Sequence, residues 1–96
     1  MSKYQPSEKQ KRYFGEMLQG ALLEIRTLGW EGKAEQAGDL ADAFHTLPTY
    51  MFSAEFDWRL FRNGFLKPYQ DKYSRAPHQA HRDYLAMLDE IENIEN

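Results

Sequence analysis

The chain of 96 residues contains no cysteine and no valine. The lack of cysteine excludes disulfide bonds, thiolate nucleophiles, and zinc or iron–sulfur sites built on cysteine. The lack of valine, with no apolar–polar alternation, argues against β-strands and predicts an all-α protein. No apolar run approaches the roughly 18–20 residues that cross a bilayer, and the first residues are polar, unlike a signal peptide. We therefore expect a soluble, cytoplasmic protein that does not enter a membrane.

The charge is slightly acidic, with 15 acidic and 12 basic residues and a formal net charge of −3. Nucleic-acid binding needs a basic face that displaces counterions from phosphate, so this balance argues against a nucleic-acid partner. The charge is also segregated: residues 1–12 hold four basic residues and one acidic residue, whereas residues 76–96 hold five acidic residues and one basic residue. An up-down bundle would place these two blocks side by side, where they would neutralise each other.

Nothing divides the chain, because it has no repeat, low-complexity tract or Gly/Ser/Pro-rich linker, and residues 1–96 are predicted to form one domain. Ser7 and Gln10 have the spacing of a capping box, and Gly29 is suited to end the helix that follows. Apolar residues recur between them at steps of three and four, as on the buried face of a helix. These residues are Tyr13, Phe14, Met17, Leu18, Ala21, Leu22, Ile25 and Leu28.

A second helical stripe runs from Ala34 to Phe44 and is expected to end at Leu47–Pro48, because proline disfavours helix in the residue before it. We expect Pro48–Phe52 to be a loop. Ser53 is a plausible N-cap for a third helix that begins near Ala54. Glu55 and Asp57 would then lie in its first turn, where the helix dipole favours acidic residues.

Pro68 leaves two possibilities for the third helix, since proline inside a helix removes a hydrogen bond and crowds the preceding turn. The helix either kinks and continues to Tyr73, or breaks near Leu66 before a short helical turn at Pro68–Tyr73, which we favour. Pro77 suits the first turn of a last helix. That helix is expected to bury Tyr84, Leu85, Leu88 and Ile91. The predicted fold is a compact bundle of about four helices, up-down antiparallel or a compact orthogonal variant.

The segment Tyr50–Tyr73 holds eight of the 14 aromatic residues. Aromatic residues and arginine are enriched at binding hot spots, which makes this segment a candidate interaction surface. The alternative is that the same rings fill the core of a bundle that has no valine. The candidate partner-binding residues are Trp58, Arg59, Phe61, Arg62, Phe65 and Tyr69.

Few residues are arranged for chemistry. Asp39, Asp42 and His45 share one predicted helix and could support acid–base or metal-dependent catalysis, although a histidine at a helix C-terminus is also explained by the helix dipole. His78 and His81 lie three residues apart but have no further ligand spacing near them, so we interpret them as surface histidines. We expect no metal, no cofactor and no enzymatic activity.

Our leading hypothesis is a non-enzymatic protein–protein interaction module that binds through residues 50–73. The stretch Asp39–Pro48 looks like small bacterial proteins, so we consider a bacterial or phage type, with an inhibitor or immunity-like protein as one form by analogy. A homodimer whose third helix completes a shared core is the second hypothesis. A small metal- or acid–base-dependent enzyme that uses Asp39, Asp42 and His45 is the third.

Overall fold

The computed structural model describes residues 5–51, 56–73 and 83–94, and over these ranges the chain forms helices and no β-strand. The prediction of an all-α bundle is confirmed. The elements in chain order are α1 (Glu8–Trp30), α2 (Ala34–Phe44), α3 (Leu47–Met51), α4 (Trp58–Leu60), the π-helix η1 (Phe61–Leu66), α5 (Lys67–Tyr73) and α6 (Tyr84–Glu92).

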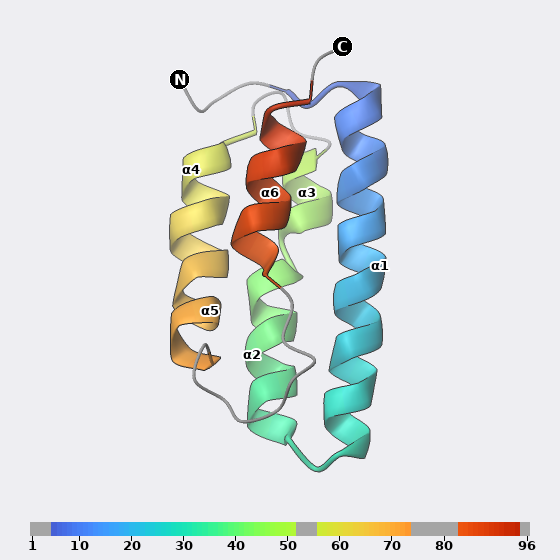
Figure 1. Cartoon of the computed structure of the whole chain (residues 1–96), viewed down its shortest axis with the longest axis vertical. Helices are drawn as coiled ribbons and strands as arrows, with labels where there is room; N and C mark the ends of the chain where they lie inside the picture. The colour runs from blue at the N-terminus through green and yellow to red at the C-terminus, as the bar shows by residue number, and fades with distance from the viewer. Residues whose placement is uncertain (1–4, 52–55, 74–82, 95–96) are drawn as a thin grey trace.

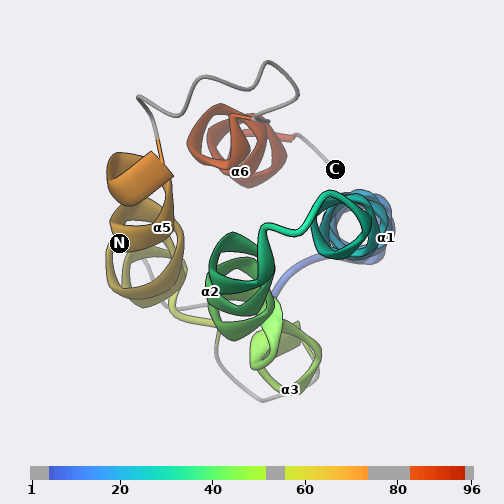
Figure 2. The same cartoon turned by 90° about the horizontal axis from the view of Figure 1, so that it is seen from below.

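The helices lie roughly along the long axis of the molecule (Figure 1). In that view α1 descends, α2 and α3 ascend, α4 to α5 descend and α6 ascends. Seen from below, α1 and the α4–α5 rod lie on opposite sides, with α6 between them on one side and α2 on the other (Figure 2). One side of α1 is therefore left without a neighbour among the described helices.

Gln10 ties the start of α1 to the end of α6. The predicted capping box is present: the Ser7 N–H donates to Gln10 Oε1 at 2.9 Å, and the Gln10 N–H donates to Ser7 Oγ at 3.1 Å. Gln10 Nε2 also donates to the carbonyls of Ile91 at 3.1 Å and Glu92 at 3.4 Å. The start of α1 and the end of α6 thus lie side by side, although no ion pair links α1 to α6 over the ranges that the structure describes.

The end of α1 differs slightly from the prediction. The helix continues through Gly29 to Trp30. Gly32 is the glycine with a positive φ, 77°, a conformation that side chains with a Cβ rarely adopt. The turn is closed by the Lys33 N–H, which donates to the Leu28 carbonyl at 2.9 Å.

The predicted loop at Pro48–Phe52 is wrong over its described part, because Leu47–Met51 forms α3. Pro48 lies in the first turn of this helix, where its missing N–H has no intrahelical partner to lose. Leu47 is fully buried and Met51 is nearly so. Burial of these two side chains explains why so short a helix forms.

The third predicted helix begins later than expected. Ser53, Ala54 and Glu55 lie outside the described residues, but Phe56 is not helical and the helix begins at Trp58. The Asp57 side chain accepts a hydrogen bond from the Leu60 N–H at 2.9 Å. Asp57 is therefore the N-cap and not, as predicted, a residue of the first turn.

The predicted break before Pro68 is also wrong, since α4, η1 and α5 follow one another without a gap. The segment before the proline is π-helical, and the Lys67 N–H donates to the Arg62 carbonyl, five residues back. A proline ring normally collides with the carbonyl four residues before it. The wider π-helical turn relieves that crowding, so the helix passes through Pro68.

Aromatic rings form much of the core. Phe14 lies 5.0 Å from Phe56 and 5.2 Å from Trp58, measured between ring centroids. Phe44 lies 5.8 Å from Phe61 and packs edge-on against it. As predicted for the last helix, Tyr84, Leu88 and Ile91 are buried and Leu85 is half-buried. The described part of that helix begins at Tyr84, whereas Pro77 lies outside the described residues.

Candidate functional site

Three of the six predicted partner-binding residues belong to the core. Trp58, Phe61 and Tyr69 are only 1%, 0% and 4% exposed. These three rings therefore fill the core, which is the alternative interpretation of the aromatic segment, and they present no surface to a partner.

The other three residues are more accessible than these rings. Arg59 is exposed, and Phe65 is half-buried with its ring 6.2 Å from that of Phe61. Arg62 is paired with Asp89 of α6 through a 2.9 Å bond from Nε and a 3.2 Å bond from Nη2. The Asp89 carboxylate raises the pKa of Arg62 and holds its guanidinium against α6. A partner contact through these residues stays a prediction.

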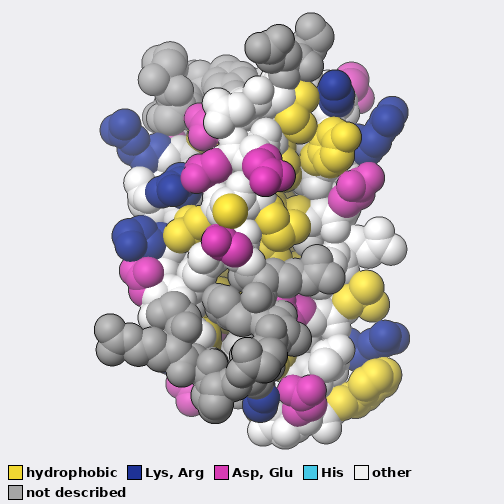
Figure 3. All heavy atoms as spheres, in the orientation of Figure 1, with side chains coloured by type: hydrophobic (Ala, Val, Ile, Leu, Met, Phe, Trp, Pro, Cys, Tyr) yellow, Lys and Arg dark blue, Asp and Glu magenta, His cyan; other side chains and the backbone are white. Residues whose placement is uncertain are grey.

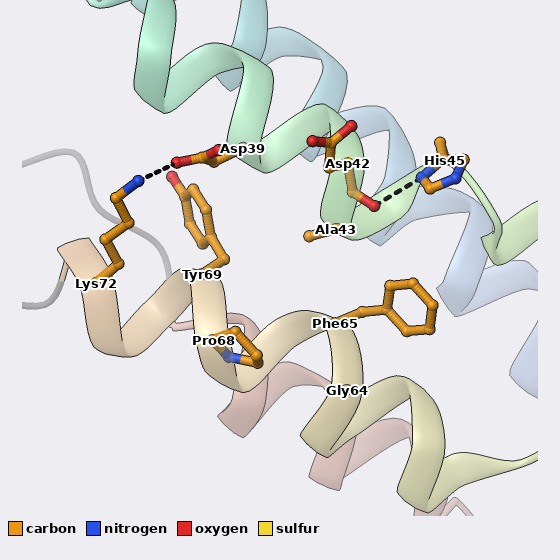
Figure 4. Close-up of a pocket in the computed structure, with 9 residues that line it drawn as sticks. All are labelled: Asp39, Asp42, Ala43, His45, Gly64, Phe65, Pro68, Tyr69 and Lys72. Atoms are coloured by element: carbon orange, nitrogen blue, oxygen red, sulfur yellow. Dashed lines mark hydrogen bonds and ion pairs between the residues drawn. The ribbon is translucent and has the colours of Figure 1, made fainter.

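A cleft of about 360 Å³ lies between α2 and the η1–α5 segment (Figure 4). It brings together the predicted acid–base residues Asp39, Asp42 and His45, and adds Lys72 from α5, which sequence reasoning did not connect with them. No local spacing could have shown this, because Lys72 lies 33 residues beyond Asp39 in the chain. Its other lining residues are Ala43, Gly64, Phe65, Pro68 and Tyr69.

Asp39 is already engaged by its neighbours. Lys72 Nζ lies 2.8 Å from Asp39 Oδ2 and 2.8 Å from Glu35 Oε2, and the Tyr73 hydroxyl donates to Asp39 Oδ2 at 2.5 Å. The hydrogen bond from Lys72, followed by that from Tyr73, lowers the pKa of Asp39, while the two carboxylates raise the pKa of Lys72. An ionised, doubly hydrogen-bonded carboxylate is a poor general base.

His45 and Asp42 do not form an acid–imidazole pair. His45 Nδ1 lies 2.7 Å from the Asp42 backbone carbonyl and not against its carboxylate (Figure 4). Because a carbonyl oxygen only accepts hydrogen bonds, Nδ1 is the donor in this contact. Over the described residues, no three His, Asp or Glu side chains gather as metal ligands would. The geometry therefore gives the enzyme hypothesis no catalytic pair.

A second polar cluster is buried between α1, α2, α5 and α6. The Tyr84 hydroxyl donates to Glu24 Oε1, and Gln36 Nε2 donates to the Tyr69 hydroxyl at 3.1 Å. Burial raises the pKa of Tyr69 to about 12, more than the bond from Gln36 lowers it. These groups fix the helices relative to one another, and they are too deeply placed to meet a ligand.

The outward side of α1 carries large apolar residues that the fold leaves uncovered. Trp30 is 74% exposed, Leu22 56% and Leu23 47%. The Arg26 guanidinium lies 4.7 Å from the centroid of the Trp30 ring. We call these four residues, Leu22, Leu23, Arg26 and Trp30, the Trp30 face. Hydrophobic and basic side chains are visible along the corresponding edge of the molecule, over the lower part of α1 (Figure 3).

Sequence reasoning missed the Trp30 face and placed Leu22 on the buried stripe. Leu22 and Tyr13, which is 41% exposed, are in fact on the accessible side of the helix. The adjacent pair Leu22–Leu23 is the signal that could have found this face. Adjacent residues lie 100° apart around a helix, so a buried stripe that is centred on Ala21 and Leu28 leaves both Leu22 and Leu23 outside the stripe.

Comparisons with protein-family models, with curated proteins and with solved structures gave no match. Within the described ranges, no helix combines the length and the apolar character needed to cross a membrane.

Proposed function

We propose that the protein is a non-enzymatic protein–protein interaction module and that it docks through the Trp30 face. The observation that carries this proposal is the exposure of Trp30, 74%, on a helix whose other side is fully packed. Tryptophan is seldom left in water, and it is one of the residues that most often dominate binding energy.

The energy of apolar burial also favours the Trp30 face as the docking surface. Covering the exposed part of an indole ring on binding contributes roughly 3 kcal/mol through apolar burial alone. Leu22 and Leu23 extend the apolar surface from Trp30 by about two turns of α1. Arg26 stacks on the Trp30 ring, which reduces the conformational freedom that both side chains lose when a partner covers them. A partner with an apolar groove and a nearby carboxylate for Arg26 would match this surface.

An inhibitor or immunity-like protein is one form that such a module can take. The bacterial or phage origin and the cytoplasmic location stay predictions of the sequence. The contacts in the cleft do not favour the acid–base enzyme. Asp39 forms an ion pair with Lys72, and the His45 ring donates to a backbone carbonyl.

The test is affinity capture from cells of the source organism with three immobilised baits: the natural chain, Leu22→Ser with Trp30→Ser, and Leu60→Ser. Leu60 is a matched control, because it is an exposed leucine, 45%, on the rod opposite α1. We expect one protein to be retained by the natural chain and by Leu60→Ser, and to be lost with the double variant.

Capture alone does not support the proposal. The retained protein, purified separately, must bind the natural chain in calorimetry and bind the double variant at least about 100-fold more weakly, the loss expected when hot-spot residues are removed. Circular dichroism must show equal helix content for all three baits. If the same proteins are retained by every bait, the Trp30 face is not the docking surface.

A further inference from the structure

The outward side of α1 forms one continuous line along the helix. Residues at steps of three and four share a face of a helix. Arg12, Gly15 and Gln19 precede the Trp30 face on this line, and Glu16 flanks it. All four are exposed. A partner that lies along α1 would thus meet a polar half and an apolar half of one surface.

We infer that the partner of the Trp30 face is a second copy of this chain, with the two α1 helices packed antiparallel. This inference rests on the function proposed above and names its partner. A two-fold interface requires a surface that is complementary to itself. The leucines set the register. When the two-fold axis passes between Leu22 and Leu23, Leu22 of each copy lies opposite Leu23 of the other.

With that register, Trp30 of each copy lies across from Gly15 of the other. A side chain that packs between helices enters a hole formed by four residues of the facing helix, and the hole here is bounded by Arg12, Gly15, Glu16 and Gln19. A Cβ built at Gly15 would meet nothing within 4 Å, so this hole has open space on its floor. The largest exposed ring and the residue without a side chain are thus placed opposite each other.

The charges agree with the same register. Arg26 of one copy lies opposite Gln19 of the other and within one helical turn of Glu16. Arg26 stays apart from the arginines of the facing helix, because it is about 10 Å along the axis from both Arg12 and Arg26 of the second copy, at 1.5 Å per residue. Parallel packing would instead place each Arg26 against its own counterpart and each Trp30 against the other.

The contact area indicates a weak dimer. The line from Arg12 to Trp30 is about 27 Å long and a helix is about 10–12 Å wide, which gives a flat footprint of roughly 300 Å² per copy. Side chains make this surface uneven, so the accessible area that is buried is larger, roughly 450 Å² per copy. The total, roughly 900 Å², falls in the size class of transient interfaces. We expect a dissociation constant on the order of tens of micromolar.

The experiment measures light-scattering mass from about 1 µM to about 1 mM, a range that brackets this constant. Three chains are compared: the natural chain, Gly15→Gln and Gly38→Gln. Gly38 is the matched control, because it is an exposed helical glycine of α2 with nothing within 4 Å of an added Cβ. Glutamine favours helix over glycine, so both variants should unfold at higher temperature than the natural chain when dilute.

The natural chain and Gly38→Gln should rise from 11.4 kDa towards twice that mass. Gly15→Gln should need a concentration at least about 30-fold higher for the same rise above 11.4 kDa, because its side chain fills the hole that Trp30 enters. A natural chain that stays monomeric at about 1 mM overturns the second copy as partner and leaves the capture experiment to test the docking face with another protein. Equal dimerisation of Gly15→Gln and Gly38→Gln overturns the antiparallel arrangement.

Discussion

The two tryptophans are in opposite environments, and exchanging each for alanine separates core from surface. Trp58 is 1% exposed and its ring lies 4.9 Å from that of Phe56 and 5.2 Å from that of Phe14. Truncating such a ring removes its apolar burial and leaves a cavity, at a cost of about 3–5 kcal/mol. A chain of this size has a total stability of roughly 5–14 kcal/mol, so Trp58→Ala should lose a large part of it.

Trp30→Ala should change stability by less than about 1 kcal/mol, because only the stacking of Arg26 on an exposed ring is lost. The free energy of unfolding is measured by urea titration, followed by circular dichroism so that the signal does not depend on tryptophan. Acrylamide quenching gives an independent check. The fluorescence of Trp30→Ala, which retains only Trp58, should be protected, whereas that of Trp58→Phe should be quenched readily.

Two results would refute this reasoning. A cost below about 1 kcal/mol for Trp58→Ala would place that ring at the surface and restore the aromatic segment as a docking site. A cost above about 2 kcal/mol for Trp30→Ala would mean that Trp30 packs against the fold and is not free for a partner.

Three further predictions concern single contacts. Gln10→Ala should cost about 2–3 kcal/mol in urea unfolding, against about 1 kcal/mol for Ser7→Ala, because Gln10 alone also satisfies two carbonyls at the end of α6; equal costs would contradict that link. Burial raises the pKa of Tyr69 to about 12, above its ordinary value near 10, so the folded state keeps a proton that the unfolded chain releases. Stability should be intact below about pH 10 and fall by about 2–3 kcal/mol towards pH 12; alkaline unfolding curves of Tyr69→Phe should show a smaller fall. Arg62→Met should cost less than about 1 kcal/mol, since its pair with Asp89 is accessible to solvent, and this cost should shrink in about 1 M NaCl.

Local features of the fold could be predicted where the cause is local. The capping box of Ser7 and Gln10 depends on a spacing of three residues, and the all-α class depends on periodicity and on the absence of strand-forming patterns. Both are confirmed. The error at Pro48 has a local origin too. Proline suits the position after the end of one helix and equally suits the first turn of the next, and burial of Leu47 decides between them.

The candidate site could not be predicted from the sequence, because exposure is a property of packing. Trp58 and Trp30 are the same residue type on helices of similar pattern, and only the placement of α4 against Phe14 and Phe56 makes one of them core. The cleft residue Lys72 reaches Asp39 from a helix that the sequence predicted to break. The π-helical turn that carries the chain through Pro68 has no signature that we could identify in the local sequence.

The sequence by itself determined the helical class, the cap that starts α1 and the apolar stripe of the last helix, since each follows from side chains within one or two turns of one another. The tertiary structure decided which aromatic rings are buried, which face of α1 is left uncovered, and which side chains pair with the Asp39 carboxylate. Those outcomes depend on contacts between residues that are dozens of positions apart, and a helix can bury any one of its sides until its neighbours are in place.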